Sequence, residues 1–224
     1  MFSDLSGLSI GLLIAAMIVS VVIHELMHGV MAYWLGDTTA QEHGRLSLNP
    51  LKSVDPLTTI ALPLLLILTT GTPFFIAKPV PFDPSRVRFG DYGAALVGLA
   101  GPASNGLLAL LGAGLYRLVG SGLLHEFGFW FALVNVGLMV FNMIPFPPLD
   151  GSRVLYAFAP EPLRRVMETI ENYGLVALLV FMFVIFKLIA GPVINLELNI
   201  LKAILEVASG KESALGRFAG IMII

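Results

Sequence analysis

The feature that most constrains this chain is an apolar run near its start that no charge interrupts. Residues Leu8–Ile23 read LSIGLLIAAMIVSVVI, sixteen positions without Asp, Glu, Lys or Arg. The run continues into HELMHGVMAYWL, and the first Lys or Arg of the chain is Arg45. A cleaved signal peptide needs a basic region before its apolar segment. We therefore expect residues 8–35 to form one retained helix that ends at Gly36, a suitable residue to follow a helix.

The composition predicts an integral membrane protein. Hydrophobic residues make up 57% of the 224 positions and charged residues 12%, with a mean hydropathy of +0.88. Soluble proteins are nearer 45–50% apolar and about 25% charged. The net charge is −2 and no basic patch with interleaved aromatic residues occurs, so we expect the lipid bilayer rather than nucleic acid as a partner. There is no cysteine, which excludes disulfides and thiolate metal sites.

Further apolar runs predict an all-α polytopic membrane protein, a bundle of about four transmembrane helices in a single domain over 1–224. The additional spans are expected at 94–119, 127–144 and 173–189. Residues 57–71 form a shorter run that contains Pro63, and spanning a bilayer takes about 20 helical residues. We therefore expect a re-entrant or short segment there. Residues 193–208 carry apolar residues at helical spacing with Glu197, Lys202 and Glu206, which predicts a C-terminal interfacial helix.

The distribution of Lys and Arg predicts the orientation, because cytoplasmic loops carry the excess of these residues. The N-terminus carries no Lys or Arg. Residues 37–90 and 146–171 carry eight, which are Arg45, Lys52, Lys78, Arg86, Arg88, Arg153, Arg164 and Arg165. We expect a multi-pass protein of the cell membrane with its N-terminus outside and these loops inside. This requires 57–71 to enter and leave on the same side, and it makes the first and third full spans run parallel.

Three ionisable residues interrupt the first apolar run. His24 and His28 are spaced i, i+4 and stand one turn apart on one helix face, and Glu25 lies about 100° around the helix. HExxH on a helix is the pattern of zinc metalloproteases, with two histidine ligands and a glutamate base. Ionisable residues inside a span are costly and are usually functional. The alternative is a pair of core histidines bonded to carbonyl groups, with Glu25 paired to one of them.

A catalytic zinc ion takes three protein ligands, so a third residue is needed. Asp150 is the best candidate, because it follows the third full span in NMIPFPPLDG, residues 142–151. Three prolines (Pro145, Pro147 and Pro148) end the helix, and Gly151 allows the chain to turn the carboxylate back toward the bundle. An ordinary Asp-Gly turn is the alternative.

These motifs resemble the site-2 protease family of intramembrane zinc metalloproteases. Besides HELMH and NMIPFPPLDG, the similarity includes GRLSLNP (44–50), AKPVPF (77–82) and AGPASN (100–105), and it is closest to the compact prokaryotic branch without PDZ or CBS domains. The resemblance implies His24, His28 and Asp150 as ligands of one Zn²⁺ and Glu25 as the base. It also implies that Asn142 helps to bind substrate. We expect Pro148 and Asn105 to contribute there too, although Asn105 has the alternative role of joining helices through hydrogen bonds.

The proline-rich stretch AKPVPFDP (77–84) is expected to be a small extended or β element. We expect it to lie near the site and to pair with an unwound substrate by strand addition, or otherwise to be a rigid surface loop.

The predicted function is that of an intramembrane zinc metalloendopeptidase in regulated intramembrane proteolysis, which cuts peptide bonds within or next to transmembrane segments. The alternatives are a non-proteolytic zinc-binding membrane protein and a metal transporter. The intact Glu25 argues against the first alternative. The single metal motif, without an internal repeat, argues against the second.

Overall fold

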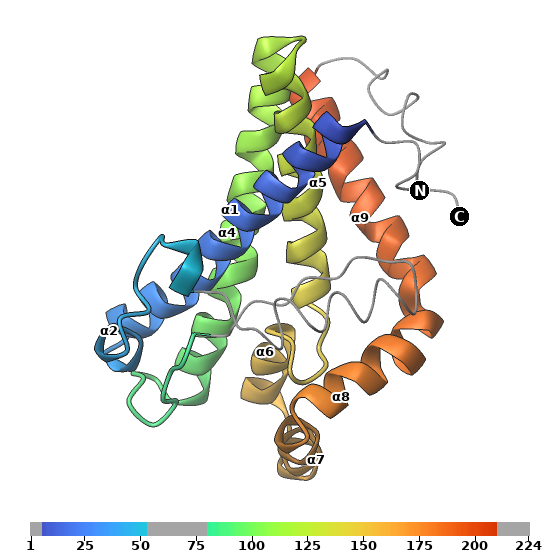
Figure 1. Cartoon of the computed structure of the whole chain (residues 1–224). Helices are drawn as coiled ribbons and strands as arrows, with labels where there is room; N and C mark the ends of the chain where they lie inside the picture. Colours follow the sequence, from blue (N-terminus) through green and yellow to red (C-terminus); the bar gives the residue numbers. More distant parts are fainter. Residues whose placement is uncertain (1–5, 53–79, 210–224) are drawn as a thin grey trace.

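The computed structural model describes residues 6–52 and 80–209, and its long helices cross one another in a bundle (Figure 1). The predicted segment 57–71 and the beginning of AKPVPFDP lie outside these ranges. Within them every regular element is a helix, and residues 80–83 form an irregular segment. The all-α prediction is therefore confirmed for the described residues, whereas the small β element and the re-entrant segment are not.

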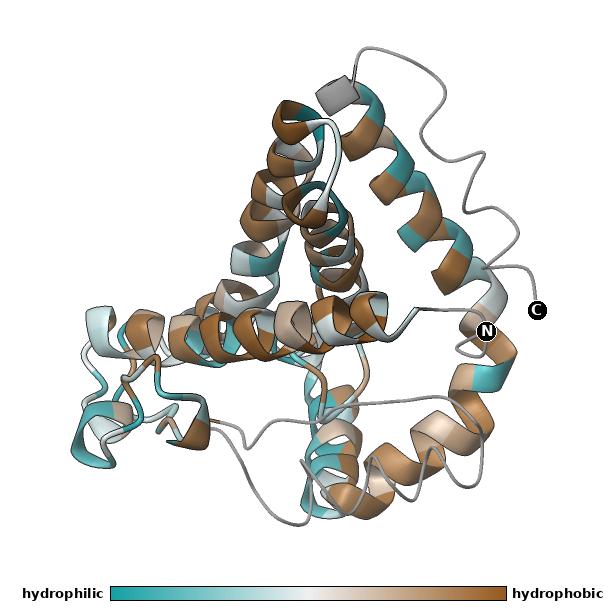
Figure 2. Ribbon diagram, turned by 45° about the horizontal axis from the view of Figure 1, so that its top comes forward, coloured by the Kyte–Doolittle hydropathy of each residue, from teal (hydrophilic) through white to brown (hydrophobic). Residues whose placement is uncertain are grey.

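Four helical runs are long and apolar enough to cross a membrane, which confirms the predicted number. They are α1 (Gly7–Trp34), α4 (Asp91–Val119), α5 (Leu123–Asn142) and the run Leu175–Glu206. That last run comprises α8 (Leu175–Val180), the π-helical turn η3 (Phe181–Ile185) and most of α9 (Phe186–Ser209). The shorter elements are α2 (Thr39–Glu42), η1 (Pro50–Lys52), α6 (Gly151–Phe158) and α7 (Glu161–Asn172). Apolar colours dominate the long helices, and hydrophilic colours gather at α2 and at α6 and α7 (Figure 2).

The structure does not divide the last apolar run as the sequence predicted. We expected a span at 173–189 and a separate interfacial helix at 193–208, but α9 continues through Pro192 to Ser209. One face of α9 packs on the bundle, since Leu201 and Leu205 are each only 1% exposed. The separate interfacial helix is therefore not confirmed, because the helix is continuous through Pro192.

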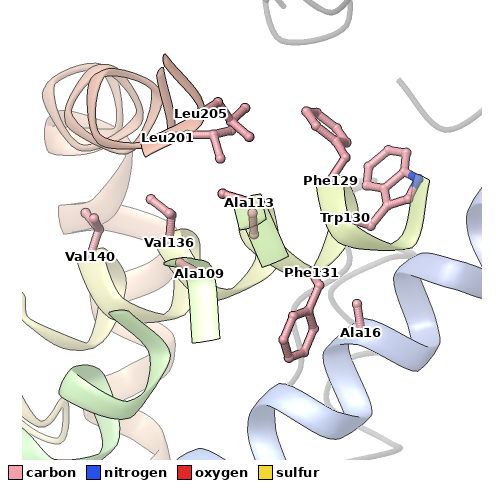
Figure 3. Close-up of a cluster of buried hydrophobic side chains, with 11 residues drawn as sticks. Ala16, Ala109, Ala113, Phe129, Trp130, Phe131, Val136, Val140, Leu201 and Leu205 are labelled. Atoms are coloured by element: carbon pink, nitrogen blue, oxygen red, sulfur yellow. The ribbon is translucent and has the colours of Figure 1, made fainter. Parts of the chain in front are cut away.

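The apolar core lies where α1, α4, α5 and α9 meet. Figure 3 shows Phe131 of α5 beside Ala16 of α1, and Leu201 and Leu205 of α9 directed toward α4 and α5. Small residues bring α4 and α5 into backbone contact: a Cβ atom on Gly112 would lie 2.7 Å from the backbone nitrogen of Ala132. Close packing of this kind holds membrane helices together where the lipid itself is apolar.

Helices α6 and α7 lie below this core, at the end of α5 where the loop leads to Asp150 (Figure 1). Arg164 of α7 forms an ion pair with Asp91 at the beginning of α4, with 2.6 Å between Nη1 and Oδ2. Arg153 of α6 forms a second ion pair with Glu171 of α7. The first pair ties α7 to the bundle, and the second ties α6, which directly follows Asp150, to α7.

Candidate metal centre

Two histidines of α1 and an aspartate that follows α5 converge at one point. The Nε2 atoms of His24 and His28 are 3.1 Å apart, and Asp150 Oδ2 lies 3.1 Å from the first and 3.3 Å from the second. The ligand atoms of these residues all lie within 4.8 Å of one another, close enough to hold one metal ion. The side chains are 7%, 11% and 22% exposed, so the cluster is largely withdrawn from solvent.

The loop between α5 and α6 folds back tightly enough to bring Asp150 to α1. It is a succession of turns, in which Ile144 N–H donates to Phe141 O and Leu149 N–H donates to Phe146 O. Leu149 is buried against α8 and η3. Gly151 packs directly on the Met143 backbone, where any Cβ atom would collide with the carbonyl group. The close packing of the loop thus requires a glycine at position 151, directly after the aspartate that supplies the carboxylate.

Glycines of α4 make room for the cluster. A Cβ atom on Gly101 would lie 2.6 Å from His24 Cε1 and would also collide with the His28 ring. One turn earlier, a Cβ atom on Gly98 would lie 3.0 Å from the backbone oxygen of Asp150. The glycines of AGPASN and its neighbourhood therefore let α4 touch both histidines and the aspartate turn at once.

The hydrogen bonds of the histidines use each Nδ1 and turn each Nε2 toward the cluster. His28 Nδ1 lies 2.7 Å from the Val97 carbonyl oxygen, which can only accept, so Nδ1 carries a hydrogen and Nε2 is the ring nitrogen left to face a metal ion. His24 Nδ1 lies 2.5 Å from Asn105 Oδ1, which is also an acceptor. Asp150 Oδ2 is buried without a hydrogen-bond partner among the described residues. Two Nε2 atoms and one carboxylate oxygen thus converge, and a cation bound between them would find three ligand atoms already in place.

The chemistry of this donor set fits zinc. Zinc takes imidazole nitrogen and carboxylate oxygen, usually in tetrahedral geometry, and a catalytic site keeps one of the four positions open. The second nitrogen of each ligating histidine normally donates to a carbonyl or carboxylate, as both do here.

Glu25 lies beside the cluster and contacts the segment that follows the undescribed part of the chain. Its Oε2 accepts a hydrogen bond from Val80 N–H at 3.0 Å. Asp37, which is fully buried just after α1, accepts another from Asp83 N–H at 2.7 Å. Residues 80–83 of AKPVPFDP are thus held along α1, next to the base. The prediction that this stretch lies near the site is supported for those four residues.

The pKa of Asp37 reflects this contact. Burial opposes ionisation, but the hydroxyl group of Thr39 and the backbone N–H groups of Thr39 and Asp83 outweigh it and lower the pKa of the carboxyl group. The ionised form of Asp37 therefore anchors residues 80–83 at neutral pH.

The remaining predicted residues take different places. Asn105 is fully buried and its amide group bonds to His24 at one end and to Asn135 at the other, which favours its alternative role of joining helices. Asn142 donates to the Leu138 carbonyl of its own helix at 3.0 Å. Pro148 is exposed in the loop, between buried Pro147 and buried Leu149. The structure therefore gathers His24, His28, Asp150 and Asn105, whereas the hydrogen bond described for Asn142 stays within its own helix.

Sequence comparison places this centre in a family. Residues 92–186, which include Asp150, match the family described as Peptidase family M50. The chain is 35% identical over 200 residues to YwhC of Bacillus subtilis, named provisionally as a zinc metalloprotease, and the match covers 82% of this chain and 85% of that protein. The chain belongs to peptidase family M50, the site-2 proteases. It is thus a zinc metalloprotease and a membrane protein.

Two further relatives carry the same provisional name. They are the Rip2 proteins of Mycolicibacterium smegmatis and Mycobacterium tuberculosis, each 30% identical to this chain. The matches cover 76% and 75% of this chain but only 66% and 65% of the relatives, slightly less than two thirds of their length. No solved structure matches the chain significantly.

Sequence reasoning missed several residues around the centre. The Val97 carbonyl, Ser20 and Asn135 all contribute hydrogen bonds that lead to the histidines. Ser20 and Asn135 carried a usable signal, because each is a polar residue in a predicted apolar span. The role of the Val97 carbonyl could not be predicted from the sequence, because every residue has a backbone carbonyl group.

Proposed function

We propose that this chain is an intramembrane zinc metalloendopeptidase, a single membrane-embedded domain that cuts peptide bonds within or next to transmembrane segments of other proteins. The observation that carries the proposal is the position of the cluster. His24 and His28 lie within the candidate span α1, in contact with the candidate span α4, and Glu25 stands beside them. A protease centre enclosed by membrane-spanning helices is suited to a substrate that is itself in the membrane.

We propose that His24, His28 and Asp150 hold one Zn²⁺. The convergence of the two Nε2 atoms and the unpartnered Oδ2 supports this assignment. When bound, zinc supplies Lewis-acid polarisation of the scissile carbonyl group and makes water a better nucleophile.

Glu25 is the proposed general base. Its Oε2 is occupied by Val80 N–H, and its other oxygen has no hydrogen bond to a described residue. That oxygen can take a proton from the attacking water and later deliver it to the leaving nitrogen. The Val80 bond limits rotation of the carboxylate, so the chain itself orients the base.

Substrate contact is proposed for the segment at 77–84 and for Asn142 and Pro148. Residues 80–83 lie in no helix, and Val80 bonds to Glu25, which leaves this segment suited to pairing with a locally unwound substrate. The orientation remains as proposed from charge, with the N-terminus outside and the centre toward the cytoplasmic side. The parallel course of α1 and α5 that this orientation requires agrees with Asp150, which follows α5 and meets the C-terminal half of α1, so that both helices end on the same side (Figure 1).

Reconstitution with zinc and a panel of tagged single-span proteins tests this proposal, with cuts mapped by mass spectrometry. The expected result is a cut within or beside a span for the native chain. The Glu25→Gln variant should lose at least about 100-fold in rate, the range for losing a general acid–base, while still binding zinc. Equal cutting by both forms, or cuts confined to soluble segments, would contradict the proposal.

A further inference from the structure

A chain of hydrogen bonds leads from His24 through three buried polar side chains on three helices. Asn105 Oδ1 of α4 meets His24 Nδ1 at 2.5 Å, and Asn105 Nδ2 donates to Asn135 Oδ1 of α5 at 2.7 Å. Asn135 Nδ2 in turn donates to Ser20 Oγ of α1 at 2.7 Å. Ser20, Asn105 and Asn135 are each 0% exposed. A continuous polar path of this kind inside an apolar bundle has to satisfy every donor and acceptor along it.

The path has a direction, and a backbone carbonyl fixes it. Asn135 Nδ2 also donates to the Phe131 carbonyl oxygen at 2.8 Å, and a carbonyl oxygen can only accept. Nδ2 of Asn135 must therefore point to Phe131, which turns Oδ1 toward Asn105. Asn105 must therefore donate from its Nδ2 to Asn135 Oδ1, and its own Oδ1 consequently faces His24. At the other end, Ser20 Oγ donates to the Ala16 carbonyl at 2.7 Å and so is free to accept from Asn135.

We propose that Asn135, supported by Ser20, is a positioning residue that selects the tautomer of His24. With Asn105 Oδ1 fixed opposite Nδ1, the imidazole must carry its hydrogen on Nδ1 and leave Nε2 bare toward Asp150. If Asn105 were reversed, its N–H would face Nδ1 and drive the hydrogen to Nε2, where it would block metal binding. The inference rests on the proposed zinc site, and it assigns control of that site to residues that touch neither metal nor substrate.

The neighbouring histidine provides an internal contrast. His28 donates its Nδ1 hydrogen to the Val97 carbonyl, so the backbone of α4 alone selects its tautomer. A change at position 135 should therefore affect His24 and leave His28 unaltered. If the path merely joined helices, loss of Asn135 would lower the stability of the bundle without distinguishing between the two rings.

Histidine ¹⁵N NMR of the full-length, metal-free protein in micelles reads the two tautomers directly. The four histidines are assigned by single substitution. In the native chain, His24 and His28 should both carry hydrogen on Nδ1. In Asn135→Leu, which removes the acceptor, His24 should shift toward the Nε2–H form while His28 keeps its signal. Asn135→Asp, at a pH low enough to keep this buried carboxyl group protonated, retains an acceptor for Asn105 and a donor for Phe131 and should restore the native His24 signal.

Zinc affinity provides the second readout, measured by competition with a chelator. Loss of a partner behind a metal ligand typically weakens binding by about 10–100-fold, which is the decrease expected for Asn135→Leu. Ser20→Ala should have a smaller effect, because Phe131 still orients Asn135. Val136→Ala is the matched control: it removes an equally buried α5 side chain next to Asn135 and should change thermal stability only.

The proposal is overturned if Asn135→Leu keeps the native His24 tautomer and zinc affinity and differs from the native chain only in stability, as Val136→Ala does. Failure of the proposed function would look different. A native chain that binds zinc but cuts no membrane protein would contradict the proposed substrates, and the tautomer and affinity measurements would still decide this inference.

Discussion

Helices α1, α4 and α5 meet at two adjoining levels that are held together by different forces. At the apolar level lie Ala16, Ala109 and Phe131 (Figure 3), and one helical turn away on each helix lie Ser20, Asn105 and Asn135. The apolar level depends on volume and close contact, which have no direction. The polar level depends on donors and acceptors that match in one orientation. The comparison indicates that substitutions at the first level should change stability, whereas substitutions at the second should change the metal centre.

The largest effect is expected from Gly101→Ala, which adds a single carbon against the histidine pair. The new Cβ atom would lie 2.6 Å from His24 Cε1, so the rings have to move out of their ligand positions. Zinc binding and proteolysis should both be abolished, measured by metal content and by cleavage of a reconstituted substrate. Gly114→Ala is the control, since nothing lies within 4 Å of its added carbon in the same helix. If Gly101→Ala bound zinc as the native chain does, the described contact of α4 with the histidines would be wrong.

A substantial effect on stability alone is expected from Leu205→Ala. Leu205 of α9 belongs to the same buried apolar cluster as Ala16, Ala109 and Phe131. This side chain is 1% exposed against α5, and truncation of a buried leucine costs about 2–5 kcal/mol. Unfolding in micelles should show the loss, and zinc affinity should not change. Leu111→Ala, at a position 67% exposed, should be close to neutral by the same measurement. A large fall in zinc affinity for Leu205→Ala would show that the two levels are not separable.

The smallest effect is expected from Asp37→Asn, outside both levels. The change weakens the hydrogen bonds to Thr39 and Asp83 and should cost about 1–2 kcal/mol at neutral pH. Because the pKa of Asp37 is lowered in the folded state, its ionised form contributes stability above the unfolded pKa of about 3.9. That contribution is lost as the pH falls through the lower folded value.

The difference in unfolding free energy between the native chain and Asp37→Asn should therefore be present at pH 7 and should shrink below about pH 4. Thermal unfolding at a series of pH values measures it. A difference that persisted unchanged into acid would mean that the charge of Asp37 does not contribute.

Local pattern was sufficient to predict the number of spans and the gathering of His24, His28 and Asp150, because each follows from a run or a motif in the chain. It was insufficient where the answer depends on packing between distant helices. By local rules Pro192 predicts a break in the helix. In the structure α9 continues past it, and Leu201 and Leu205 further along are buried against the bundle. Ser20 and Asn135 meet only because of how α1 and α5 are rotated about their axes, which no spacing within one helix specifies.

The most direct test of the central claim is zinc K-edge X-ray absorption on the purified native chain, with metal content determined in parallel. We predict one zinc per chain, bound by two imidazole nitrogens and by oxygen at about 2.0–2.2 Å. Asp150→Asn should lose most of this zinc. A zinc ion with a different number of imidazoles, or metal content unchanged by Asp150→Asn, would contradict the assignment of His24, His28 and Asp150 as its ligands.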